Sequence, residues 1–216
     1  MTLRITLAVA GRVLTQVRRD HRTAAMLLVL PCLLITLMWW MFLDSFGDPF
    51  NRFGPALLAM FPFIVMFLVT SVTTLRERSS GTLERLLAMP MGKLDFLLGY
   101  AVAFGLVAAL QALLAVGVSV GLLGLDIRGS VWLLGLVAVA DAVLGSALGL
   151  FVPRDSLPTV LSAISDVLPL SYAVDAMTHL TQSTSTTEVA QDLLVITAFA
   201  VAALGLGAAT LRRRTP

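Results

Sequence analysis

Long apolar runs alternate with short polar segments along this chain of 216 residues. Five runs are long enough for a helix to cross a bilayer, which needs roughly 20 residues. They are Ala24–Leu43, Pro55–Leu75, Leu97–Leu125, Val131–Val152 and Leu193–Leu211. The apolar residues are continuous within each run, which is typical of helices surrounded by lipid. The pattern predicts an all-α, polytopic membrane protein with one transmembrane domain over residues 1–216.

The first 23 residues have helical periodicity but too many charges for a spanning helix. At about 100° per residue, an arc of about 120° holds all the early basic residues: Arg4, Arg12, Arg18, Arg19 and Arg22. The opposite side holds the apolar ones: Leu3, Leu7, Val13, Leu14 and Val17. Such a helix lies in the membrane interface with its basic face toward anionic lipid headgroups. A solvated cytoplasmic tail is the alternative interpretation.

Two pairs of glycines suggest where helices approach one another closely. Gly117 and Gly121 lie four residues apart in the third run, and Gly145 and Gly149 repeat this spacing in the fourth. Small residues at this spacing form a shallow strip on one helix face, which allows close packing in membranes.

Residues 153–192 are the longest polar stretch between spans. Within them, residues 157–180 are amphipathic, but Pro158 and Pro169 interrupt the pattern, which excludes a spanning helix. We expect an extracellular segment with a pair of short helices that dip into the membrane. An ordinary loop is the alternative.

Composition and charge support a membrane location. The chain is 58% hydrophobic and 13% charged, whereas soluble domains are near half apolar and a quarter charged. Most basic residues lie in three blocks, at residues 4–22, 76–93 and 212–214. Such blocks mark cytoplasmic segments rather than a nucleic-acid surface. The single cysteine, Cys32, lies inside the first span, which excludes a disulfide framework or a cysteine metal site.

The charge blocks conflict with the number of runs. They place both termini and the loop at 76–96 in the cytoplasm, which requires an even number of crossings, and five is odd. The fourth run continues directly into a proline-terminated loop without a basic turn. We therefore expect that one crossing with its turn, about 20–30 residues, is absent between about Ser146 and Phe151.

Residues 76–92, RERSSGTLERLLAMPMG, have the pattern of a short helix between two spans. Gly81 and Pro90 bound this helix, Thr82 can cap it, and Glu84 lies in its first turn, where the helix dipole favours a negative charge. An apolar ridge runs along it: Leu83, Leu86 and Leu87. The pattern suits docking into a groove of a cytoplasmic partner. An amphipathic connector resting on lipid headgroups is the alternative.

The stretch RERSSGTLERLLAMPMGKLDFLLGY resembles the first cytoplasmic loop of ABC-2 type transport permeases, the membrane subunits of drug-resistance-type bacterial exporters. The matching positions are Arg76, Glu77, Gly81, Thr82, Leu83, Glu84, Leu86 and Pro90. The segments RRDHRT, FVPRDSLP and LPLSYAVDAM resemble the family's entry helix and its extracellular segment. The chain departs from the family at Ser79 and Ser80, where acidic residues are common, and in having five runs rather than six spans.

The resemblance implies a permease that moves a drug, lipid or glycan out of a bacterial cell through the plasma membrane. It also implies a homodimer or a pair with a sister permease, and cytoplasmic ABC ATPase subunits that dock on residues 76–90, including Arg85. The chain contains no G-x-x-x-x-G-K-[ST] run. ATP and Mg²⁺ are therefore expected on the ATPase, and no enzymatic activity, cofactor or metal is expected on this chain.

Four polar residues are candidates for a substrate path: Gln111, Asp141, Tyr172 and Asp175. Asp141 lies near the middle of the fourth run, where an ionised carboxylate is costly unless paired or hydrated. A substrate contact, a proton carrier and a packed, hydrogen-bonded carboxyl group all remain open, with Gln111 as a candidate partner. Tyr172, Asp175 and His179 follow a broken-helix region and either line the path or stabilise the fold.

Two further functions remain as alternatives. An ion-coupled secondary transporter would use Asp141, although such proteins have inverted repeats or several intramembrane charges, which this sequence lacks. A membrane scaffold without transport activity is the other alternative, and the expected absence of one crossing favours it.

Overall fold

The computed structural model describes residues 3–43, 49–79, 93–151, 169–182 and 187–210. Seven helices contain nearly all of them: α1 (Leu3–Arg19), α2 (His21–Phe42), α3 (Pro49–Ser79), α5 (Lys93–Gly121), α6 (Val131–Phe151), α8 (Pro169–Gln182) and α9 (Thr187–Thr210). These ranges contain no strand. The predicted all-α fold is therefore confirmed.

Five of these helices, α2, α3, α5, α6 and α9, are long and apolar enough to cross a membrane. They coincide with the five predicted runs, so this part of the prediction is confirmed. The largest difference in extent is in α3, which has 31 residues and continues beyond the apolar run as far as Ser79. Its last turns therefore carry Arg76 out of the hydrophobic part of the bundle.

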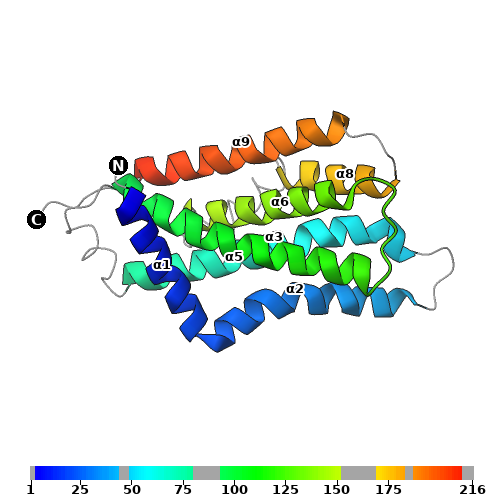
Figure 1. Cartoon of the computed structure of the whole chain (residues 1–216), viewed down its shortest axis with the longest axis horizontal. Coiled ribbons are helices and arrows are strands. Elements are labelled where there is room, and N and C mark those ends of the chain that lie inside the picture. The colour runs from blue at the N-terminus through cyan, green and yellow to red at the C-terminus, as the bar shows by residue number, and fades with distance from the viewer. Residues whose placement is uncertain (1–2, 44–48, 80–92, 152–168, 183–186, 211–216) are drawn as a thin grey trace, which may run out of the picture.

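The five long helices lie side by side, and α1 crosses one end of the bundle (Figure 1). We call this the α1 end and the opposite one the far end. At the far end, the backbone N–H of Asp126 donates to Asn51 Oδ1 at 2.8 Å. The N–H of Gly129 donates to the carbonyl of Leu180, also at 2.8 Å. These two bonds join the start of α3, the α5–α6 connection and the end of α8.

Helix α8 runs from the middle of the bundle toward the far end (Figure 1). Both α6 and α9 run from the far end to the α1 end, so the chain must cross back between them, and α8 forms the last part of that return. With 14 residues it rises about 21 Å, which is less than the bilayer core of about 30 Å.

The short helix α8 explains the conflict between the charge blocks and the number of runs. Five long helices and a shorter return bring α1 and the end of α9 to the same end of the bundle (Figure 1). One of the two expected short helices is thus present as α8. Helix α6 continues without a break through Ser146 to Phe151, so a missing crossing does not interrupt it. The other expected short helix falls in residues 152–168, outside the described residues.

Helix α6 packs closely against α3 through two glycines. A Cβ atom on Gly145 would lie 2.5 Å from the carbonyl oxygen of Phe63, and one on Gly149 would lie 2.5 Å from that of Phe67. Both contacts advance by four residues in the same direction, as expected for parallel helices. The predicted close packing at this pair is confirmed.

The other predicted glycine pair behaves differently. A Cβ atom on Gly117 or Gly121 of α5 would meet nothing within 4 Å. This strip therefore does not pack against another described helix of the same chain, and the prediction of close packing here is wrong within the chain.

Replacing Gly145 by alanine should destabilise the bundle, because the added methyl group would meet backbone atoms of α3 that cannot rotate away. Overpacking of this kind typically costs about 1–3 kcal/mol. Thermal unfolding of the purified protein in detergent would measure the loss. Gly117→Ala is the matched control, since its methyl group enters open space. Equal unfolding temperatures for the two variants would contradict the close α3–α6 contact.

Candidate functional site: a polar surface at the α1 end and buried polar residues between the spans

Helix α1 packs onto the start of α5 through one face. Thr6, Val9, Ala10 and Val13 are buried. A Cβ atom on Gly99 of α5 would lie only 2.6 Å from Val9 Cβ. This close contact fixes α1 across the end of the bundle and turns its opposite face outward.

The outward face of α1 is basic, as predicted. Four side chains on it are exposed: Arg4, Arg12, Arg18 and Arg19. The predicted apolar face needs one correction, because Leu3 and Leu7 are 75% and 55% exposed. They lie at the flank between the buried and basic faces, where a helix at the membrane interface contacts acyl chains.

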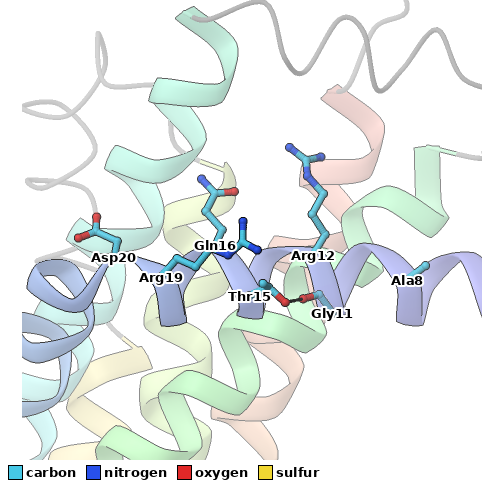
Figure 2. Close-up of a pocket in the computed structure, with 7 residues that line it drawn as sticks. All are labelled: Ala8, Gly11, Arg12, Thr15, Gln16, Arg19 and Asp20. Atoms are coloured by element: carbon cyan, nitrogen blue, oxygen red, sulfur yellow. Dashed lines mark hydrogen bonds between the residues drawn. The ribbon is translucent and has the colours of Figure 1, made fainter.

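An open pocket lies on this outward face. In the described part of the chain, its lining residues come from α1 or directly follow it: Ala8, Gly11, Arg12, Thr15, Gln16, Arg19 and Asp20. In Figure 2 the side chains of Arg12 and Gln16 point to the same side of the helix, and Arg19 extends back along it toward Gln16. The Thr15 hydroxyl donates to the carbonyl of Gly11 at 2.7 Å. The pocket thus has a floor of small residues between polar side chains.

The sequence pattern predicts the basic face but not this pocket. The signal was present in the spacing of Ala8, Gly11 and Thr15, which lie three and four residues apart between the arginines. Residues at this spacing lie on one face of a helix, so small side chains there leave a hollow.

Asp20 joins α1 to α2 and lies near the end of α3. It is the N-cap of α2: Oδ2 accepts from the Thr23 hydroxyl at 2.6 Å and Oδ1 from the Thr23 N–H at 3.2 Å. These bonds lower the pKa of Asp20, and the positive charge of Arg76 on α3 contributes in the same direction. Arg76 is exposed, one turn before the end of α3. The α1–α2 corner therefore lies close to the end of α3.

Both helices that flank the segment at 80–92 are held firmly. Helix α3 is held through its glycine contacts with α6. The first turns of α5 are held by α1 through the close contact of Gly99 with Val9. Within α5, the buried rings of Phe96, Tyr100 and Phe104 stack along one face, with centroids 4.5 Å apart for Phe96–Tyr100 and 6.2 Å apart for Tyr100–Phe104. Because of this packing, a force applied between these two ends would reach α6 through α3 and α1 through α5.

Most residues of the predicted partner-binding helix cannot be placed. Arg76 and Glu77 belong to the last turns of α3. Gly81, Thr82, Leu83, Glu84, Arg85, Leu86 and Pro90 lie outside the described residues. The role of all nine remains a prediction.

A second group of polar residues is buried between the spans. Asp141 is 1% exposed and Gln111 is fully buried. Neither side chain has a hydrogen-bond partner within the described part of the chain, and the same is true of the Thr70 and Ser119 hydroxyl groups. The suggested hydrogen bond between Asp141 and Gln111 is therefore absent. Asp141 lies one turn before Gly145, on the side of α6 that faces α3.

The two other candidates for a substrate path lie on the outside of the bundle. Tyr172, Asp175 and His179 follow one another on the exposed face of α8. The opposite face of α8 is buried through Ala173, Ala176, Met177 and Leu180. The structure thus separates Tyr172 and Asp175 from Gln111 and Asp141 and does not combine them into one site. Among the described residues, no group of three His, Cys, Asp or Glu side chains could hold a metal ion.

Comparison with known proteins finds a matching family and two similar permeases. The family described as ABC-2 type transporter matches residues 5–152. Over 66 residues the chain is 41% identical to the probable multidrug ABC transporter permease YbhR of Escherichia coli (strain K12). The same identity is found with the protein of that name from Escherichia coli O157:H7. The matched segment covers 30% of this chain and only 18% of the relative.

Replacing Asp141 by valine should raise the stability of the bundle, because a buried carboxyl group without a partner costs about 1–3 kcal/mol. Thermal unfolding in detergent at neutral pH would report the change as an increase of several degrees. The matched control is Asp175→Val on the exposed face of α8, which should leave the unfolding temperature nearly unchanged. A marked decrease for Asp141→Val would show that the carboxyl group has a stabilising partner.

Proposed function

The chain belongs to the ABC-2 type transporter family, and from this premise we propose that it exports a hydrophobic or amphipathic substrate from a bacterial cell. As a member of this family it is a membrane subunit of an ABC transporter. The proposed substrate class is a drug, lipid or glycan, and the multidrug permease named above supports the first of these. The energy would come from ATP and Mg²⁺ bound to a separate ATPase subunit.

The main support comes from the α1 end of the bundle. Helix α1, with its exposed arginines, crosses this end of the bundle, and α3 ends here shortly after the exposed Arg76 (Figure 1). Positive charge concentrates on the cytoplasmic side of membrane proteins. We therefore assign the α1 end, with both chain termini, to the cytoplasm and the far end to the outside of the plasma membrane.

In this orientation the segment at 80–92 faces a cytoplasmic ATPase. Its apolar ridge and Glu84 would dock in a groove of the ATPase, and closure of the ATPase on ATP would push on the ends of α3 and α5. The glycine contacts between α3 and α6 would carry this movement into the bundle. Two ATPase subunits are expected, together with a second copy of this chain or a sister permease.

The exposed face of α8 is the proposed contact with the substrate path. Tyr172 and Asp175 lie on a helix that starts within the bundle, and polar side chains at membrane depth require water or a protein partner rather than lipid. A substrate path shared with the second permease would supply both water and a protein partner for these side chains. Gln111 and Asp141 would act from inside the bundle, by opening or holding the interface between α3 and α6.

A second candidate function is ion-coupled transport through Asp141. The observation that favours it is the burial of this carboxyl group without a partner, because such a site can exchange a proton. Loss of proton-dependent flux on Asp141→Asn would support this candidate over the ATP-driven one.

Charge reversal at Glu84 should abolish binding of the ATPase. We expect a candidate ATPase to co-purify with the wild-type chain in mild detergent and to be lost with Glu84→Arg, because Glu84 lies on the proposed docking helix. Asp175→Arg reverses a charge at the other end of the bundle and is the matched control. If both variants retain the ATPase, Glu84 does not contribute to docking.

Cysteine labelling should show the proposed orientation. In a Cys32→Ser background, a membrane-impermeant maleimide should label Asp126→Cys in intact cells. It should label Ala8→Cys, on α1, only after the membrane is permeabilised. The reverse pattern would place the α1 end outside and exclude docking of a cytoplasmic ATPase on residues 76–92.

A further inference from the structure

We propose that the pocket on α1 binds the phosphate of one anionic phospholipid headgroup. The pocket offers the donors that a phosphate diester needs, namely the guanidinium groups of Arg12 and Arg19 and the side-chain amide of Gln16. Arginine is well suited to phosphate because its planar group donates parallel hydrogen bonds. This is a defined site for one lipid and goes beyond a general attraction of the basic face to the membrane.

The shape of the pocket fits a single headgroup. Arg12 and Arg19 are separated by seven residues, which is about 10 Å along the helix, so their long side chains can converge above the turn between them. Figure 2 shows Arg19 extended toward Gln16 on the side to which Arg12 points. The floor below is low, because Gly11 has no side chain and a Cβ atom there would meet nothing within 4 Å.

The Thr15 hydroxyl and Asp20 restrict how the headgroup binds. The Thr15 hydroxyl donates its proton to the carbonyl of Gly11, so it offers no donor to the phosphate, and Arg12, Arg19 and Gln16 would supply the donors. Asp20 holds negative charge at one end of the pocket, where Thr23 satisfies its carboxylate. A phosphate would therefore lie toward Arg12 and Gln16, away from Asp20.

The position of the pocket favours a lipid over a free anion. Helix α1 crosses the ends of the spans (Figure 1), at the level where headgroups lie. Leu3 and Leu7 are exposed beside the basic face and can contact the acyl chains of the same lipid. A soluble phosphate would use the arginines but would gain nothing from these two leucines.

A bound headgroup would also stabilise the α1–α2 corner near the end of α3, from which the proposed docking segment at 80–92 continues. The pocket ends at Asp20, whose carboxylate caps α2 and lies within the electrostatic influence of Arg76 on α3. An anionic lipid would thus hold α1 and the α1–α2 corner in place beside the root of the segment at 80–92. This consequence for coupling rests on the proposed function, whereas the lipid site itself does not.

Native mass spectrometry of the full chain would test the site with dioleoyl phosphatidylglycerol as the probe. We expect one lipid per chain to remain bound, and the double variant Arg12→Gln/Arg19→Gln to weaken this binding by about tenfold or more. Arg4→Gln/Arg18→Gln removes the same charge from the same helix outside the pocket and should retain the lipid. Gly11→Leu keeps every charge but fills the floor, and it should also lose the lipid.

Several outcomes would overturn the proposal. Equal losses in the two double variants would indicate general electrostatic attraction, and full binding by Gly11→Leu would show that the pocket is not the site. Equal retention of dioleoyl phosphatidylcholine would remove the requirement for an anionic headgroup. Displacement of the lipid by millimolar inorganic phosphate would identify a soluble anion as the ligand.

Two controls keep the test independent of folding and of the transport hypothesis. Thermal unfolding of each variant would show whether lost binding reflects a lost fold, and Gly11→Leu remains decisive if the double variant is unstable because its side chain enters open space. Lipid binding is measured without the ATPase. Absence of lipid binding would not contradict the proposed docking at Glu84. Absence of ATPase docking would likewise not contradict the lipid site.

Discussion

The packing of α6 against α3 determines how the remaining helices can be arranged. Gly145 and Gly149 bring α6 close to the backbone of α3, and the two helices run in the same direction. Parallel neighbours in a membrane require the chain to cross back between them. For α3 and α6 this crossing is α5, which packs against both. For α6 and α9, which are also parallel neighbours, the return ends with α8. Parallel packing of α6 and α9 therefore requires a return to the far end, where α9 begins, and α8 forms the last part of this return.

Burial of polar side chains between the spans lowers the stability of the bundle. Asp141 and Gln111 have no hydrogen-bond partners among the described residues, although a bundle made only to be stable would place apolar side chains there. Residues that reduce stability are expected where a protein moves or binds. Asp141 lies on the side of α6 that faces α3, and α3 leads directly to the proposed docking segment at 80–92. An unsatisfied group at this interface would make its separation less costly, which is what a transporter that alternates between two arrangements requires.

Sequence patterns predicted the membrane fold well because burial in lipid imposes a simple rule on composition. Each spanning helix must be apolar over its whole length, so the five runs could be read directly, and the basic blocks indicated which ends lie together. Close contacts were harder to predict, because Gly145 and Gly117 occur in the same small-residue pattern and only the positions of neighbouring helices distinguish them. The same reason applies to Asp141 and Gln111, whose separation depends on helix rotation, and to the exposure of Leu3 and Leu7, which depends on where α5 meets α1.

Helix α1 combines a buried face that packs on α5 with a polar face that carries the pocket. Its buried face holds the start of α5 through Val9 and Gly99, and its polar face carries the pocket and ends at Asp20. Since Asp20 caps α2 and lies near Arg76 of α3, α1 links three of the helices that meet at the α1 end. If the segment at 80–92 docks on an ATPase as proposed, its movement would reach the spans only if the ends of α3 and α5 do not bend at the membrane surface. Helix α1 lies across these ends and contacts the start of α5, so it would resist such bending in a way that a flexible tail before the first span would not.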